Sequence, residues 1–287
     1  MRTTRDLRRL TGLTNLILTA VLALACGAAA QARQAGARET RPAASAASLL
    51  ATIKAVDSDP TPREARARNE AVEGLKRMGA AAVPALREFL KTEKDPARVY
   101  AAAALAGIEP SNTLARQALT DVALNGKGDE VIEATVTLAG LDPEEDAAVP
   151  ALVRMASKSI LIPSAKNMRR MRGSALALAL TPPGLRALTP LLAHWDSWVR
   201  QAAVFAFDER TESLGGASAA VRAAVAGAVP RLVKALADKD EIVRGVAAES
   251  LEQLGGEALP ELRKAAAGGD RKLAAAAAEL LRQMGRG

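Results

Sequence analysis

Aromatic residues and cysteine are nearly absent from this 287-residue sequence, and histidine occurs once. Aromatic residues make up 2% of the chain, whereas 49% of it is hydrophobic and that fraction is dominated by alanine, leucine and valine. Strands need β-branched and aromatic faces, while small aliphatic side chains suit closely packed helices. The composition therefore predicts a mostly helical protein.

The scarcity of cysteine and histidine also limits the chemistry. Cys26 has no second cysteine to pair with, so an internal disulfide is excluded. A metal site would need several His or carboxylate ligands at helical spacing, and the sequence shows no such set. Gly-rich phosphate-binding motifs are absent as well. We therefore expect neither a metal nor a cofactor. His194 lies at the end of a predicted helix without an obvious catalytic partner. We interpret it as a structural residue whose positive charge the helix dipole would favour, rather than as a catalytic base.

Residues 1–30 have the pattern of a secretory signal peptide. Four arginines within the first nine residues precede an uncharged run from Thr11 to Ala30, which has its apolar centre from Leu16 to Ala25. A membrane-spanning helix needs about twenty strongly apolar residues, and this segment decays into small residues before it reaches that length. We expect the segment to be cleaved and the protein to be exported, to the periplasm or outside the cell.

Two routes of processing remain open at this segment. Residues 28–30 and 30–32 each have small side chains at the positions that a signal peptidase recognises, so either could be the cleavage site. The stretch 23–27 resembles a loose lipoprotein box, which would place a lipid anchor on Cys26, although Ala23 stands where a leucine would strengthen the match. Residues 31–44 contain Pro42 and lack apolar periodicity, so we expect a flexible linker there and a folded domain over 45–287.

The formal net charge of +7 overstates the charge of the predicted mature protein. Removal of residues 1–30 takes away four arginines and Asp6, which leaves 35 basic and 31 acidic residues and a net charge of about +4 spread along the chain. Binding to nucleic acid by counterion release needs a concentrated basic face. We therefore expect no nucleic-acid partner.

From Ser45 onward the sequence contains an internal repeat. Such a repeat predicts a repeat architecture, and it is a stronger indication of the fold than any single local feature. Five segments share a Pro-x-Leu core after apolar residues, and a proline is tolerated in a first helical turn because its missing N–H would be unpaired there. If the repeat unit is a pair of helices, each of these prolines predicts the start of the first helix of a pair or a change in the direction of that helix, its re-aiming. They are Pro84, Pro150, Pro190, Pro230 and Pro260.

A second pattern alternates with the first. Arg-x-x-Ala-x-x-x-Leu-x-x-(Leu/Met)-Gly runs from Arg68 to Gly79 and again from Arg244 to Gly255, and part of it follows Arg98 and Arg200. Steps of three and four residues indicate one buried helix face. The final glycine predicts a left-handed cap at the end of the helix.

The alternation of two helix starts resembles the HEAT-like repeat family over residues 45–286. One helix starts with Val-Pro-x-Leu, and the next starts with Asp-x-x-Val-Arg, as in Asp196–Arg200 and Asp240–Arg244. Because one helix pair cannot bury its apolar face alone, neighbouring pairs are expected to stack into an all-α solenoid, or superhelix, of about six or seven pairs with an extended concave surface. The resemblance also implies that Arg98, Arg200 and Arg244 form a ladder between adjacent pairs. We expect the pairs near 45–78, 80–108, 112–141, 145–181, 184–208, 217–254 and 257–285.

The sequence favours a non-catalytic scaffold that binds another protein, exported by a bacterium, with membrane contact only through the signal segment or a lipid on Cys26. The alternatives are an enzyme built on a HEAT-like solenoid, for example a lyase-like one, and a structural envelope protein. Some HEAT-like families are enzymes, among them an iron-dependent hydroxylase built on His-Glu pairs, bilin lyases and a DNA glycosylase. The sequence contains no His-Glu pair.

One candidate partner site breaks the repeat. The fourth pair carries about eight extra residues between its helices, and they lead into Lys166, Arg169, Arg170 and Arg172, four positive charges within seven residues. Like charges one turn apart destabilise a helix, so we predict that this segment binds an acidic protein or an anionic envelope surface, and that reversal of Arg169 and Arg170 weakens binding without unfolding the protein. The alternative is a solvated helix start without a partner.

A second candidate site is the turn at Asp196, which Trp195 and Trp198 flank. Tryptophan is enriched among the residues that dominate binding energy at interfaces. Packing between helices is the interpretation that we favour for both side chains, with an interface role as the alternative.

Overall fold

The computed structural model describes residues 45–56, 60–93, 96–126, 129–142, 144, 146–158 and 164–285. The predicted signal peptide, the linker and Cys26 lie outside the described residues. Ser45–Gly287 is a compact unit by itself.

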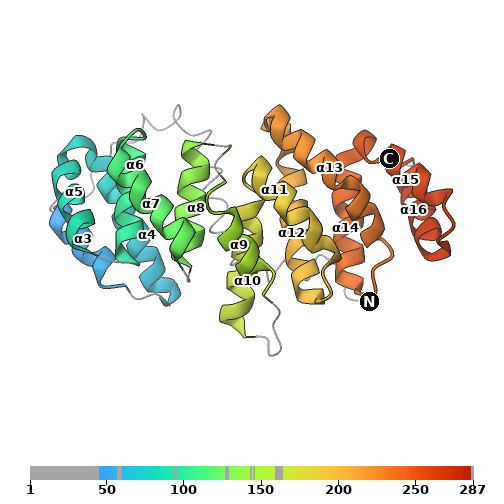
Figure 1. Cartoon of the computed structure of the whole chain (residues 1–287), viewed down its shortest axis with the longest axis horizontal. Helices are drawn as coiled ribbons and strands as arrows, with labels where there is room; N and C mark the ends of the chain where they lie inside the picture. The colour runs from blue at the N-terminus through green and yellow to red at the C-terminus, as the bar shows by residue number, and fades with distance from the viewer. Residues whose placement is uncertain are drawn as a thin grey trace, which may run out of the picture. The chain divides into compact units, whose positions relative to one another are not determined.

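The described residues of this unit form α-helices and short 3-10 helices, and no strand occurs among them. Each helix packs against the helix two places along the chain, as α4 does with α6 and α6 with α8. Within six of the seven pairs the two helices also pack against each other, and in the pair of α11 and α12 the contact to α12 is made by η2. Alternate helices therefore form two layers, and the pairs follow one another in chain order (Figure 1). The predicted all-α solenoid is confirmed.

The first layer consists of the first helix of each pair. Its members are α3 (Ala46–Lys54), α5 (Val83–Thr92), α7 (Thr113–Asn125), α9 (Val149–Ala156), α11 (Pro182–Leu188), α13 (Ala219–Ala235) and α15 (Leu259–Ala266). The second layer consists of α4 (Pro62–Met78), α6 (Ala97–Ile108), α8 (Glu130–Leu141), α10 (Ala165–Leu178), α12 (Ser197–Glu212), α14 (Glu241–Leu254) and α16 (Arg271–Met284). Short 3-10 helices follow four of the helices: η1 (Gly79–Ala82), η2 (Thr189–Ala193), η3 (Leu214–Gly216) and η4 (Gly255–Glu257).

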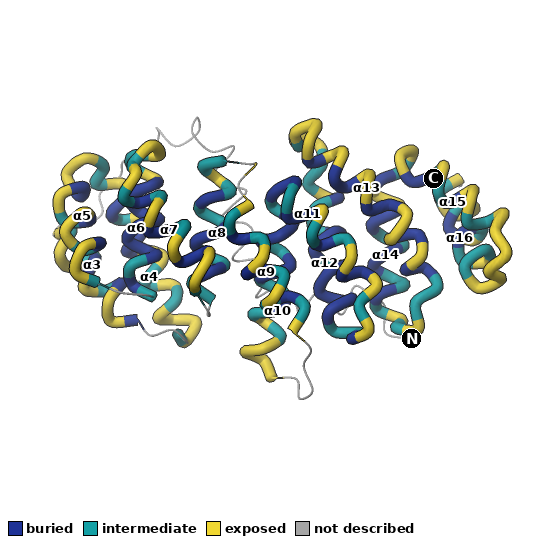
Figure 2. Tube along the Cα trace, in the orientation of Figure 1, coloured by how far each residue is buried: buried dark blue, intermediate teal, exposed yellow. Residues whose placement is uncertain are grey.

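The hydrophobic core lies between the layers and runs without a break from Leu50 to Leu280. Figure 2 shows this buried interior and the exposed outer turns. Alanine is central to it: Ala101, Ala102, Ala104 and Ala106 of α6 are fully buried. Small side chains let α6 pack against helices of its own pair and of both neighbouring pairs. The low aromatic content of the sequence thus follows from close helix spacing.

Aspartate side chains begin several second-layer helices. The Asp196 carboxylate accepts a hydrogen bond from the Trp198 N–H, and Asp240 and Asp270 accept in the same way from the first turns of α14 and α16. Such caps satisfy N–H groups that have no partner within the helix. The carboxylates that the repeat pattern contains are therefore used within the fold.

Gly79 and Gly255 end α4 and α14 with φ of 57° and 55°. The sign of φ agrees with the predicted left-handed cap, but ψ is −135° and −121°, far from the left-handed helical value. Both glycines instead turn the chain sharply into a 3-10 helix that leads to the next proline-containing helix. The two junctions share one geometry, which explains why the sequence pattern ends on glycine at both.

Three of the five repeat prolines lie where they were predicted, in the first turns of α5, α9 and α15. No first-layer helix starts at Pro190 or Pro230, and the change from α11 to η2 at Pro190 agrees with the predicted re-aiming of a helix instead. Pro190 opens η2, which continues α11 from its own start at Pro182, and Pro230 lies inside α13. Pro230 cannot donate a hydrogen bond to the Ala226 carbonyl, and its ring crowds that carbonyl. Since both residues are exposed, that carbonyl stays open to water and the helix continues.

Candidate partner-binding surfaces

The basic segment forms the first half of α10. Ser164 caps the helix, because its hydroxyl accepts a hydrogen bond from the Asn167 N–H at 3.2 Å. The connection before it spans 157–164, longer than the 93–96 connection between α5 and α6, and its residues 159–163 lie outside the described part of the chain. The connection is therefore longer, but by four residues rather than the predicted eight or so, and the connection 55–61 between α3 and α4 is nearly as long.

The four cations of this segment divide into two kinds. The Arg170 Nε donates to the Asp129 carboxylate at the start of α8, at 2.9 Å. The Arg172 guanidinium lies 5.5 Å from the centre of the Phe205 ring of α12. Arg170 and Arg172 therefore connect α10 to its neighbours in the second layer. Lys166 and Arg169 are the two exposed cations of the segment.

The two tryptophans also differ. Trp198 is half-buried against the core, in agreement with the packing interpretation. Trp195 is 70% exposed, so packing between helices is wrong for this residue. The reason is the turn geometry: Trp195 stands before the Asp196 cap, outside the helix, while Trp198 belongs to the first turn of α12.

Arg200 holds the backbone of this turn. Its Nη1 donates to the carbonyl oxygens of His194 and Trp195 at 2.8 and 3.1 Å, and its Nε and Nη2 donate to the Asp238 carboxylate at 2.8 and 2.9 Å. Desolvation raises the pKa of Asp238, but the hydrogen bonds from Arg200 and from the Asp240 N–H outweigh it and lower that pKa. Arg200 thus joins two adjacent pairs, as the resemblance implied.

The other two ladder arginines behave differently. Arg244 donates through Nη1 to the carbonyl oxygens of Asp238 and Lys239, at 2.9 and 3.1 Å, which lie in the turn of its own pair. The ladder role is therefore wrong for Arg244, because its guanidinium turns back on the preceding loop. Arg98 lies 3.9 Å from Asp121 of the next pair, a weak contact of the kind expected.

His194 ends η2, as the sequence predicted for a helix terminus. Its Nδ1 accepts a hydrogen bond from the Asp196 N–H at 3.1 Å, and its ring lies 5.5 Å from that of Trp195. The His194 ring thus takes part in the structure of this turn.

Sequence patterns missed a contact between α4 and α6. The Arg68 guanidinium lies 3.8 Å from the centre of the Tyr100 ring, a cation–π contact. The pKa of Tyr100 is raised, chiefly by burial and then by the charge of Glu133, and Arg68 opposes the shift. Burial likewise raises the pKa of Glu133 on α8. Arg68 was the first residue of a recognised pattern, but nothing in that pattern relates it to a tyrosine in the next pair.

Tyr100 allows a direct test of this packing, because it is the chain's single tyrosine. Its raised pKa means that the folded protein favours the neutral phenol, so its contribution to stability is complete below the unfolded pKa of about 10 and is lost at higher pH. We expect no phenolate absorbance from the folded chain as pH rises through about 10. The absorbance should appear together with loss of the helical circular dichroism signal; phenolate formation at the ordinary pKa in a fully helical chain would contradict the packing.

A polar contact between α12 and α14 was also missed. Ser250 is fully buried, and its hydroxyl lies 3.2 Å from the Asp208 carboxylate, which Gln253 also contacts at 3.3 Å. The Thr211 hydroxyl donates to the Gln253 side chain as well. The signal in the sequence is a serine on the apolar face of α14, among residues spaced by three and four. It indicates a buried hydrogen bond without identifying the partner.

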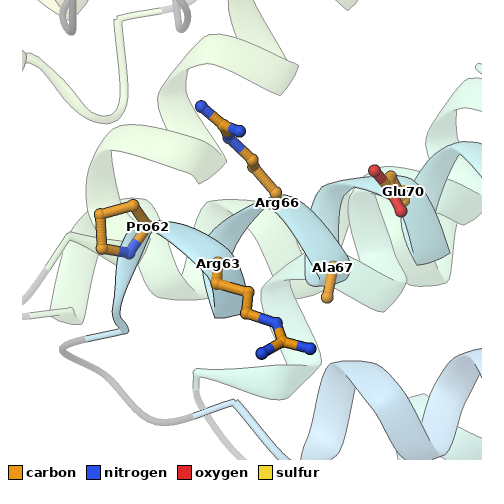
Figure 3. Close-up of a pocket in the computed structure, with 5 residues that line it drawn as sticks. All are labelled: Pro62, Arg63, Arg66, Ala67 and Glu70. Atoms are coloured by element: carbon orange, nitrogen blue, oxygen red, sulfur yellow. The ribbon is translucent and has the colours of Figure 1, made fainter.

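A depression beside α4 is lined by residues of that helix alone: Pro62, Arg63, Arg66, Ala67 and Glu70. Figure 3 shows that the Arg63 and Arg66 side chains point in different directions. Charges that diverge do not bind one small ligand between them. This surface is the solvated outer face of α4.

Among the described residues, no group of three or more His, Cys, Asp and Glu side chains is placed to hold a metal ion. None of the described helices is both long enough and apolar enough to cross a membrane.

The fold and its repeated turns define the class, a stack of antiparallel helix pairs. Residues 185–282 match the family model for HEAT repeats, and residues 67–92 match the model for the PBS lyase HEAT-like repeat. These two parts of the chain therefore carry HEAT-like repeats, in agreement with the sequence resemblance.

Comparison with other proteins adds little to this assignment. A crystal structure of an engineered protein is 19% identical, and the match covers 84% of this chain and 96% of that chain with a TM-score of 0.30. No curated protein matches the chain.

Proposed function

We propose that this protein is a non-catalytic scaffold that binds another protein along its helix layers. The observation that carries the proposal is the uninterrupted second layer from α4 to α16, in which each helix contacts the next but one. Stacked repeats of this kind present extended surfaces that suit macromolecular partners. The single histidine supports the proposal as well, since His194 is used in a turn.

The exposed half of the basic segment is the proposed contact for an acidic partner. Lys166 and Arg169 are exposed one turn apart on α10. Arg170 and Arg172 are unsuitable for a test of binding, because they contact Asp129 and Phe205 within the fold. Reversal of Arg170 would place a new carboxylate beside Asp129, so loss of binding in that variant would not separate a binding role from a folding role.

We expect the double variant Lys166→Glu and Arg169→Glu to capture its acidic partner at least ~10-fold less well, because charge reversal at an interface creates repulsion. The measurement is affinity capture from envelope extract with the full chain as bait, quantified per partner. The matched control is Arg231→Glu with Lys234→Glu on α13, two exposed cations at the same spacing. Both variants should keep the wild-type melting temperature.

Two results would count against this assignment. Equal loss in both double variants would show a general effect of net charge rather than a site on α10. An unchanged partner set in the α10 variant, with the same melting temperature, would place the binding surface elsewhere on the stack.

We also propose export to the bacterial periplasm or the cell exterior, in a soluble form or as a lipoprotein at Cys26. The arginine-led apolar pattern of residues 1–30 supports this proposal. The modest net charge supports a protein rather than a nucleic acid as partner.

A further inference from the structure

Two turns of the stack have the same construction. In the turn between α11 and α12, Arg200 donates to the carbonyl oxygens of His194 and Trp195. In the turn between α13 and α14, Arg244 donates to the carbonyl oxygens of Asp238 and Lys239. The following aspartate caps the next helix in both turns. Trp195 and Lys239 therefore occupy equivalent positions.

This equivalence shows that the turn does not need an aromatic side chain. Lys239 is an exposed, solvated charge in a turn of the same geometry. Trp195 is 70% exposed, and the large hydrophobic residues that are exposed in the described part of the chain are Trp195 and Leu124. The indole is thus apolar surface that folding does not require.

The turn that carries Trp195 is also unusually well fixed. Arg200 is 4% exposed and binds both Asp238 oxygens as well as the Trp195 carbonyl oxygen. A buried ion pair contributes little net stability compared with apolar packing, while it does fix geometry. An aromatic side chain on a fixed backbone loses little conformational entropy when it enters a partner's pocket.

The cations of the two turns that follow along the stack indicate the charge of such a partner. The Lys272 ammonium group donates to the carbonyl oxygens of Ala237 and Asp238, so the last three turns between paired helices lie together. Lys239, Arg271 and Lys272 are exposed there. Of the carboxylates of these turns, Asp196, Asp238 and Asp240 serve as caps or bind Arg200. Asp270, which caps α16, and Glu241 are the two that are exposed. Cations outnumber the carboxylates that face solvent.

We propose that Trp195, Lys239, Arg271 and Lys272, the Trp195 edge, form a docking surface for an acidic protein segment that carries apolar side chains. The apolar side chains contact the indole, and the acidic side chains face the three cations. This inference rests on the proposed scaffold function and names a surface separate from the basic segment of α10.

The test selects short random peptides, displayed on phage, against the immobilised full chain. The dissociation constants of the selected peptides, made synthetically, are then compared among variants. We expect peptides rich in Asp, Glu and large apolar residues, and a loss of affinity of ~10-fold or more for Trp195→Lys, a loss typical of a dominant interface residue. Trp195→Lys introduces the residue that stands at the equivalent position, Lys239, in the sister turn between α13 and α14. Its melting temperature should therefore be that of the wild type. Leu124→Lys is the control at the other exposed hydrophobic residue and should bind like the wild type.

Fluorescence gives a second readout that does not depend on affinity. The chain has two tryptophans, so a Trp198→Phe variant reports on Trp195 alone. A selected peptide should shift its emission to shorter wavelength, because the indole leaves water.

Several outcomes would overturn the Trp195 edge. Peptides that bind Trp195→Lys as tightly as the wild type, peptides without acidic residues, or no selected peptide would each do so. Loss of binding in Lys166→Glu with Arg169→Glu, but not in Trp195→Lys, would refute this inference and leave the scaffold function standing. Binding of vesicles that contain anionic lipid, dependent on Trp195 and without any peptide binding, would assign the edge to a membrane surface instead.

Discussion

Gly184→Ala is expected to lower the free energy of unfolding by about 3 kcal/mol or more, at the upper end of the cost of overpacking a core. Gly184 is buried in the first turn of α11, directly after the chain leaves α10. A Cβ atom there would lie 2.1 Å from the Leu178 carbonyl oxygen and 2.8 Å from its carbonyl carbon. Backbone atoms cannot rotate away as the end of a side chain can, so α10 and α11 must move apart.

The measurement is denaturant unfolding followed by circular dichroism. Gly245→Ala is the matched control: it lies inside α14, where an added Cβ meets nothing within 4 Å. Alanine is better than glycine in a helix interior, so this variant should gain about 0.5–1 kcal/mol. Equal stability of the two variants would contradict the close approach of α10 and α11.

Periodicity predicted the two-layer stack because the same few contacts recur in every pair. Residues at steps of three and four recur at Arg68 and Arg244, and each copy reinforces the other. The close approach at Gly184 occurs once, so no repeated pattern marks it. Pro190 shows a related limit: the repeat predicted the start of this pair near residue 184, close to Pro182, but the Pro-x-Leu pattern at Pro190 marks the change from α11 to η2 rather than a helix start.

The candidate site was harder to predict, because the contacts that define it join residues far apart in the sequence. Arg170 and Asp129 are 41 positions apart, and Arg200 and Asp238 are 38 apart. The sequence shows that four cations cluster in the first half of α10, but only packing decides that two of them contact neighbouring helices. The exposure of Trp195 likewise depends on where η2 ends, and helix ends are poorly marked by composition.

The second large effect is expected for Arg200→Met. Methionine fills similar space but donates no hydrogen bond, so Asp238 loses its ion-pair partner while its side chain is 12% exposed. The carbonyl oxygens of His194 and Trp195 lose their donor as well. Removal of one partner from a buried pair costs about 3–5 kcal/mol. Arg244→Met is the control in the sister turn: it loses only two carbonyl contacts and should cost about 1 kcal/mol.

The pH dependence of this cost separates the ion pair from lost packing. The pKa of Asp238 is lowered in the folded protein, because the Arg200 and Asp240 hydrogen bonds outweigh desolvation. A lowered pKa means that the contribution of Asp238 to stability is present above its unfolded value of about 4 and is lost as pH falls through the folded value. The difference in unfolding free energy between the wild type and Arg200→Met should therefore be constant near neutral pH and shrink below about pH 4.

A double variant completes the argument. Asp238→Asn keeps an oxygen that accepts from the Asp240 N–H but removes the charge that Arg200 neutralises. Combined with Arg200→Met it should cost less than Arg200→Met alone, since no unpaired charge stays buried. Stability of the single and double variants is measured by denaturant unfolding across the same pH range. If the cost of Arg200→Met does not change with pH and Asp238→Asn does not reduce it, Arg200 acts through packing alone, and the Trp195 turn is not held by the ion pair.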